Sequence, residues 1–152
     1  MADYNRDEEA VEAAIRYAES YYGTTYIFGG DDPVGGFDCS GFADEVMRSV
    51  GLSPFPNKPN AAQMFTFYAR SGNSMPTVHP VRGALIFIKH HDAITHVEIC
   101  LDDRFSISAS GGDGTVDHPQ DAINKNAFVK QRQIRRWSPE YELIFLDPFV
   151  EV

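Results

Sequence analysis

The first half of the chain shows the apolar periodicity of helices, separated by stretches rich in turn residues. Residues 7–22 place alanine, valine and isoleucine at helical spacing between charged side chains, and Gly23 is suited to end that helix. A second helix is expected over residues 39–50. A third helix is expected over residues 61–70, because Asn60 can cap its first turn.

The second half of the chain changes to short runs rich in β-branched and aromatic residues, with turn residues between them. Strands are expected over residues 83–89, 95–101 and 104–110, with one or two more in 128–137 and 141–149, and a short helix over 119–127. Helices followed by a meander of strands predict an α+β fold with an antiparallel sheet. No repeat or linker divides the sequence, so we expect one domain over residues 1–152.

Composition narrows the class of protein. An apolar share of 43% and a charged share of 23% are typical of a folded globular chain. No apolar run approaches the ~20 residues that a membrane helix needs, and the acidic N-terminal segment lacks the apolar core of a signal peptide. We therefore expect no membrane insertion, and synthesis in the cytoplasm without a signal peptide.

Charge argues against one class of partner. With 13 lysines and arginines against 22 acidic residues, the net charge of −9 excludes general binding to nucleic acid, which requires a positive contact surface. The basic residues do cluster late in the chain, at Lys125, Lys130, Arg132, Arg135 and Arg136. Two interpretations stay open for them, namely a local cationic patch and a solvated strand and loop.

Cys39 follows a glycine-rich loop at the expected start of the second helix, in the stretch "GGFDCSGF". Unpaired backbone N–H groups and the positive end of the helix dipole would favour its thiolate, the form that acts as a nucleophile. The small neighbours Ser40 and Gly41 leave room for a substrate carbonyl, and backbone N–H groups there could hold an oxyanion. The alternative is a structural cysteine packed at the start of a helix.

A nucleophilic cysteine needs a base, and His96 is the best placed of the five histidines. It opens the alternating segment "HVEICL", where a rigid strand could aim its imidazole at the end of a helix. Alternation places His96, Glu98 and Cys100 on one face of this strand. A lone histidine on a strand can equally be a packed or surface residue.

A metal site is a weaker alternative. His90, His91, Asp92 and His96 do not match the spacing of a compact zinc site. The loops "GGDDPVGG" and "SGGDGTVDH" lack the ligand spacing of a calcium loop. We expect neither a metal nor another cofactor.

The motif from Tyr26 through Gly29-Gly30 to "GFDCSGF", with "HVEI" some sixty residues later, resembles the NlpC/p60 superfamily of cell-wall cysteine peptidases. The likeness runs from the first helix to the terminal "LDPF", and "SASGGDG" with the following segment is similar to the phage and prophage branch. It implies a compact papain-like fold, in which N-terminal helices pack on a central antiparallel sheet.

The resemblance also implies roles for individual residues. Cys39 would be the nucleophile and His96 the general base. Tyr26 would lie beside the thiolate and help to hold the oxyanion, together with backbone N–H groups near Ser40. Asp38 would brace the active-site turn, and as a helix N-cap it would be expected there on simpler grounds.

Two positions depart from the pattern of the family. The family usually places a polar residue, often histidine, on the next strand to orient the imidazole, and counting without gaps puts Ser108 there. Serine can accept a hydrogen bond but supplies no charge, so Glu98 or Asp113 could replace it. Glu98 stands where a small residue is common, and it could bind a substrate amine, raise the pKa of His96 or face solvent.

The function implied by the resemblance is hydrolysis of amide bonds in peptidoglycan stem peptides, next to D-glutamate, through an acyl-thioester. The alternative is a catalytically silent relative that serves as a structural or wall-binding part of a phage tail or secretion assembly. The same chemistry could also serve an amidase or acyltransferase. The expected partner is the stem peptide, with a phage tail as a candidate larger assembly, and the expected location is the virion or the cell wall after release.

Overall fold

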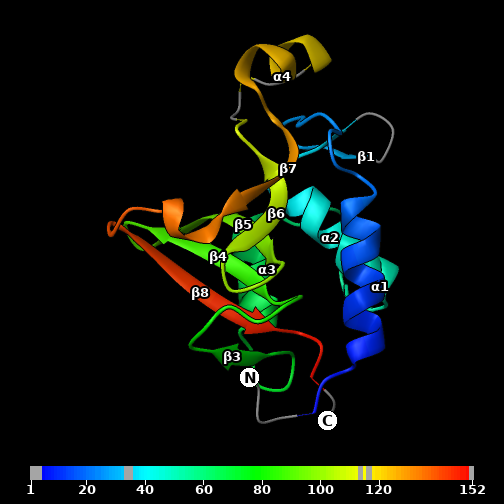
Figure 1. Cartoon of the computed structure of the whole chain (residues 1–152), viewed down its shortest axis with the longest axis vertical. Helices are drawn as coiled ribbons and strands as arrows, with labels where there is room; N and C mark the ends of the chain where they lie inside the picture. The colour runs from blue at the N-terminus through cyan, green and yellow to red at the C-terminus, as the bar shows by residue number, and fades with distance from the viewer. Residues whose placement is uncertain (1–4, 33–35, 113–114, 116–117, 151–152) are drawn as a thin grey trace.

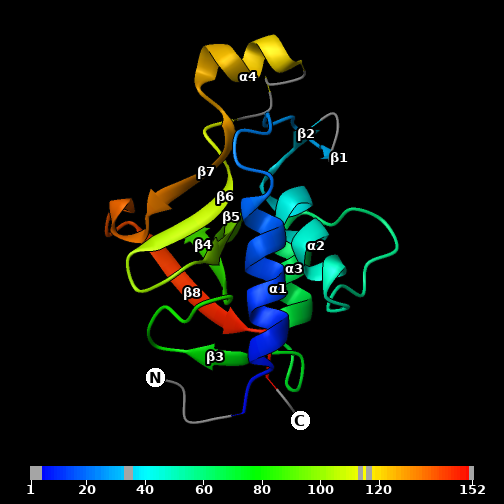
Figure 2. The same ribbon diagram turned by 45° about the vertical axis from the view of Figure 1, so that its right-hand side comes forward.

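The structure, a computed structural model, describes residues 5–32, 36–112, 115 and 118–150. Two helices, α2 (Cys39–Ser49) and α3 (Ala61–Tyr68), pack against one face of a six-stranded antiparallel sheet, and α1 (Glu8–Glu19) packs on α2 (Figures 1 and 2). The strands of this sheet are β3 (Met75–Thr77), β4 (Leu85–His90), β5 (Ala93–Cys100), β6 (Phe105–Ser110), β7 (Phe128–Gln133) and β8 (Tyr141–Asp147). The expected α+β class and papain-like NlpC-type arrangement are confirmed.

Side-chain caps fix where the three helices begin. The Asp7 carboxylate accepts the Ala10 N–H at the start of α1, and the Asp38 carboxylate accepts the Gly41 N–H at the start of α2. Asn60 and Gln63 form a reciprocal capping box on α3. Each cap satisfies backbone donors that a helix leaves unpaired in its first turn, which is why these starts could be predicted from the sequence.

The order of the strands differs from the expected meander. The sheet order is β3-β8-β4-β5-β6-β7, so the last strand of the chain lies between β3 and β4. β3 was not expected from the sequence. It contains Pro76, which lacks a backbone donor and is tolerated because β3 forms one edge of the sheet.

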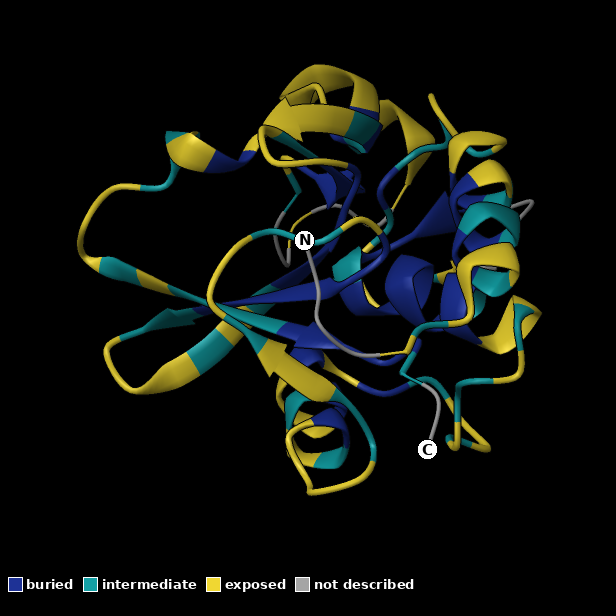
Figure 3. Cartoon of the chain, turned by 60° about the horizontal axis from the view of Figure 1, so that its bottom comes forward, coloured by how far each residue is buried: buried dark blue, intermediate teal, exposed yellow. Residues whose placement is uncertain are grey.

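The alternation of side chains along β4 and β5 divides the core into two layers. Phe87 and Val97 face the helices, whereas Ile86 and Cys100 face the opposite layer, under Ile134. The buried residues gather where the helices meet the sheet (Figure 3). The expected two faces of the segment "HVEICL" are therefore confirmed.

Four smaller elements complete the described chain. A two-stranded hairpin, β1 (Asp31–Asp32) and β2 (Gly36–Phe37), leads into α2. A short 3-10 helix, η1 (Ile134–Arg136), connects β7 to β8, and α4 (Pro119–Lys125) lies at the end of the molecule opposite β3 (Figure 1). No helix in the described part of the chain is both long and apolar enough to span a bilayer.

The sheet opens where α2 begins. Within the described residues, the ladder between β5 and β6 consists of Ile99 with Ile107 and Cys100 with Ser106, although β6 pairs with β7 over its whole length. The backbone N–H and C=O groups of residues 96–98 and 108–110 therefore do not pair with each other in this ladder. Helix α2 packs against both β5 and β6.

Gly41→Ala is expected to destabilise the start of α2. An added Cβ would lie 2.0 Å from the carbonyl oxygen of Gly30, and neither backbone can yield without moving the loop before the helix. We expect the free energy of unfolding to fall by about 2 kcal/mol, and Tm to fall by roughly 5 °C. Thermal unfolding measures this, and an unchanged Tm would contradict the close packing of the loop on the helix.

Candidate active site

Cys39 is the first residue of α2 and is half-buried in the opening between β5 and β6. Its sulfur lies at the positive end of the helix dipole, and the backbone N–H of Val97 also points to it. Both features favour a thiolate at this position.

The turn before Cys39 is held by a network around Asp38. One carboxylate oxygen of Asp38 accepts the Gly41 N–H at 2.7 Å, and the other accepts the Gly29 N–H at 3.1 Å. Lys58 forms an ion pair with Asp38 at 2.9 Å and donates to the Ser40 hydroxyl at 3.1 Å. Asp38 and Ser40 are therefore engaged in bracing the nucleophile turn. Nothing in the proline-rich sequence around Lys58 indicated its part in this network.

His96 and Cys39 interact directly in the structure. Burial by itself raises the pKa of the Cys39 thiol, but the charge of His96 and a hydrogen bond from its ring outweigh burial, so that pKa lies below its ordinary value. Burial by itself lowers the pKa of His96, but Cys39 and Glu98 together raise it to about 10. Each group therefore stabilises the charged form of the other.

Glu98 is the group that holds the far side of the imidazole. Its carboxylate lies 2.9 Å from Nε2 of His96, which leaves Nδ1 as the nitrogen for Cys39. The side chain of Glu98 is 0% exposed, so the alternative in which it faces solvent is wrong. Burial disfavours its charge, but hydrogen bonds and the charges of His96 and Arg136 outweigh burial and lower the pKa of Glu98 to about 2.

Ser108, expected to orient His96, contacts Glu98 instead of the imidazole. Its hydroxyl donates to Glu98 at 3.4 Å and shares a 2.7 Å hydrogen bond with Ser110. The expectation of direct contact with His96 is therefore corrected, because Glu98 occupies the far nitrogen of the ring. Asp113, the other candidate, lies outside the described residues.

Two residues in this network were not expected from the sequence. The Ser106 hydroxyl donates to Glu98 at 2.6 Å, and Arg136 from η1 donates to both carboxylate oxygens of Glu98. The alternating serines of β6 were a local signal for Ser106. Arg136 belongs to the late basic cluster, but its sequence position, 38 residues after Glu98, gave no indication of the contact.

Tyr26 and Trp137 border the site from two sides. Tyr26 is buried and bridges to Phe37, two residues before Cys39, and its ring packs against the backbone of Gly112. The ring of Trp137 lies 5.7 Å from that of His96, centroid to centroid. Tyr26 therefore lies beside the residues that lead to Cys39, and its contact with the thiolate and its part in holding the oxyanion stay predictions. Trp137 adds an aromatic wall that the sequence did not indicate.

The arrangement supports nucleophilic catalysis. A thiolate at a helix N-terminus can attack a carbonyl, an imidazolium beside it can protonate the leaving group, and a buried carboxylate can hold that imidazolium in place. Among the described residues, no group of three or more His, Cys, Asp or Glu side chains could hold a metal ion.

Comparison with known proteins identifies the family. The family model described as NlpC/P60 matches residues 23–135, which include Tyr26, Cys39 and His96. The chain belongs to the NlpC/P60 family. The resemblance to this family is therefore confirmed, and the phage or prophage branch stays a prediction.

Two solved structures and one curated protein illustrate what this chain is similar to. The NlpC/p60 domain of the peptidoglycan hydrolase SagA is 24% identical, with a TM-score of 0.62, over 89% of this chain and 97% of that one. The peptidoglycan hydrolase RipB from Mycobacterium tuberculosis is 24% identical, with a TM-score of 0.67, over 95% of this chain and 67% of that one. Protein P54 from Enterococcus faecium is 28% identical over 85% of this chain, which spans about a fifth of that protein (21%).

Proposed function

We propose that this chain is a cysteine peptidase that hydrolyses an amide bond in peptidoglycan stem peptides, next to D-glutamate, through an acyl-thioester. The observation that carries the proposal is the buried chain of contacts from Cys39 through His96 to Glu98. Similarity to peptidoglycan hydrolases supports the substrate class.

The steps follow from the positions of these groups. The Cys39 thiolate attacks the carbonyl carbon, and backbone N–H groups at the start of α2 are placed to stabilise the oxyanion. His96 donates its proton to the leaving amine, which leaves a thioester on Cys39. His96 then takes a proton from water, and hydroxide attack releases the new carboxylate and restores the thiolate.

The geometry favours an enzyme over a catalytically silent relative. A buried charge costs free energy unless it is paired. A protein that only binds the wall would gain nothing from a buried carboxylate that contacts an imidazole, which in turn contacts a thiol. Here Glu98 is fully buried and paired with both His96 and Arg136. The phage-tail partner and the location at the virion or wall stay predictions from the sequence.

Digestion of purified peptidoglycan tests the proposal. Walls of several stem-peptide chemistries are incubated with the protein, and new amino termini are counted and assigned by mass spectrometry. We expect fragments cut next to D-glutamate. Release of no amine from any wall would contradict a hydrolase, and transfer of the acyl group to an added amine without hydrolysis would favour the acyltransferase alternative.

A further inference from the structure

Cations gather on one edge of this acidic protein. Four of its 13 lysines and arginines lie within residues 128–137, a segment without any acidic residue. This segment forms β7, the edge strand of the sheet, and η1. Arg104 joins them, because its carbonyl accepts the Ile134 N–H. We refer to Lys130, Arg132, Arg135 and Arg104 as the β7 cationic strip.

The strip begins beside the catalytic network. Arg132 pairs with Ser106 and Lys130 pairs with Ser108 in the ladder between β6 and β7. Residues directly opposite each other on neighbouring strands have side chains on the same face of the sheet. The two cations therefore lie on the face where Ser106 and Ser108 donate to Glu98.

Within the described residues, the strip has few internal partners for its positive charge, and Glu98 is the acidic group that attracts Arg132. The guanidinium groups of Arg132 and Arg104 have no hydrogen-bond or ion-pair partner there, while Lys130 bonds to the carbonyl of Asn126 and Arg135 to the amide of Gln133. Burial and the repulsion of neighbouring arginines lower the pKa of Lys130, and for Arg132 burial and the repulsion of Arg136 outweigh the attraction of Glu98 and lower its pKa. Like charges held together in this way would be stabilised by an anionic ligand.

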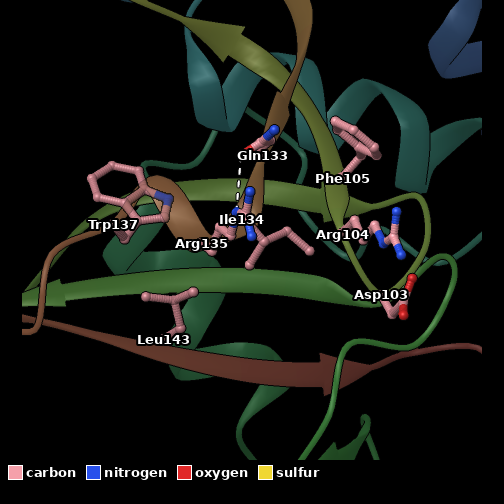
Figure 4. A pocket seen from close by; sticks show the side chains of 8 residues that line it. All are labelled: Asp103, Arg104, Phe105, Gln133, Ile134, Arg135, Trp137 and Leu143. Carbon is pink, nitrogen blue, oxygen red and sulfur yellow. Dashed lines mark hydrogen bonds between the residues drawn. The ribbon is translucent and has the colours of Figure 1, made fainter.

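The strip leads into a pocket of about 490 Å³ on the sheet face away from α2 and α3 (Figure 4). Ile134 and Leu143 give the pocket apolar surface, and Arg104 and Arg135 give it positive charge, with Asp103 as an acidic side chain in the lining. The volume is in the range of pockets that hold small ligands. Trp137 closes one end of the pocket and packs on the ring of His96.

We propose that the β7 cationic strip and this pocket bind carboxylate groups of the peptide whose amide bond is held at Cys39. The proposal rests on the proposed function, since the occupant must belong to the molecule that reaches His96. The planar fork of arginine matches a carboxylate, and the apolar pocket wall suits small side chains between the charges. Carboxylates next to the cleaved bond would then be determinants of specificity.

Binding to a catalytically inactive protein tests this inference separately from hydrolysis. Every protein carries Cys39→Ala, and titration calorimetry compares a soluble stem tetrapeptide that has free carboxylates with the same peptide amidated at those groups. We expect the free peptide to bind at least tenfold more tightly. Arg104→Gln with Arg132→Gln should remove this difference, and Tm should change little, because neither guanidinium has a hydrogen bond or ion pair within the described residues to lose.

Arg70→Gln is the matched control, since Arg70 is an exposed arginine that follows α3, outside the strip. It should keep the tenfold preference. Equal binding of the two peptides, or binding of neither, would overturn the proposal. A second outcome would also overturn it: the double variant loses affinity for a glycerol-phosphate polymer but still prefers the free peptide to the amidated one. The strip would then be a binding site for phosphate groups. Charges on an edge strand can also serve to prevent pairing with the sheet of another molecule. That role alone would give no difference in affinity between the free and the amidated peptide.

Discussion

Cys39→Ala is expected to abolish release of new amino termini from peptidoglycan, lowering the rate by a factor on the order of 10⁴ or more. Without the sulfur no thioester can form, and His96 alone cannot activate water in the geometry set for a thiolate. The side chain is half-buried at the start of a capped helix, so alanine should leave the fold intact. The measurement is the rate of amine release, with Tm recorded for each protein.

Cys100 offers a matched control for the loss of a thiol. It is buried in the opposite layer of the core, and burial raises the pKa of its thiol to about 12, which leaves it protonated and unreactive. Cys100→Ala should therefore keep the hydrolytic rate within a few fold of the wild type and cost only the stability of a small cavity. Equal loss of activity in both variants would point to disturbed folding and would contradict the assignment of Cys39 as the nucleophile.

Glu98→Gln is expected to slow hydrolysis by a factor on the order of 10² to 10⁴. The amide keeps the size of the side chain but removes the negative charge that stabilises the His96 imidazolium, while the positive charge of Arg136 stays beside it. The pKa of His96 should fall from about 10, and Cys39 should lose the counter-charge that keeps its thiol pKa low.

The pH dependence of thiol alkylation measures this change without any substrate. In the wild type the thiolate forms as pH rises through a lowered thiol pKa, so alkylation of Cys39 by iodoacetamide should already be fast at neutral pH. In Glu98→Gln the imidazolium loses its proton at lower pH, the thiol pKa rises, and the midpoint should move up by about one unit or more.

Ser106→Ala distinguishes the effect of the Glu98 charge from the effect of disturbing the side chains around Glu98. It removes one hydrogen bond from the carboxylate but leaves the charge and the contact with His96. We expect a loss of about 1 kcal/mol in stability, with little change in the alkylation midpoint. If Glu98→Gln shifts the midpoint no more than Ser106→Ala does, Glu98 does not set the charge state of the pair.

Local signals explain what could be predicted from the sequence. Asp38 caps α2 through an N–H three residues later, and the alternation through His96 and Val97 assigns two faces within a single strand. These patterns depend on groups a few residues apart, so the candidate nucleophile, its candidate base and the elements that carry them are encoded in short stretches of the chain. The family motif extends the same local information to the expected fold and chemistry.

The remaining features of the fold and the site depend on contacts between segments that are distant in the sequence. Arg136 reaches Glu98 across 38 residues, Lys58 reaches Ser40 across 18, and β8 enters the sheet between β3 and β4. No pattern within one segment specifies such a neighbour, because it depends on which strands pair and in which register. For that reason the sequence alone determined that Cys39 and His96 are the candidates for catalysis. Only the tertiary structure decided that Glu98, and not Ser108, lies on the far side of the imidazole, and that Lys130 and Arg132 of β7 lie opposite Ser108 and Ser106.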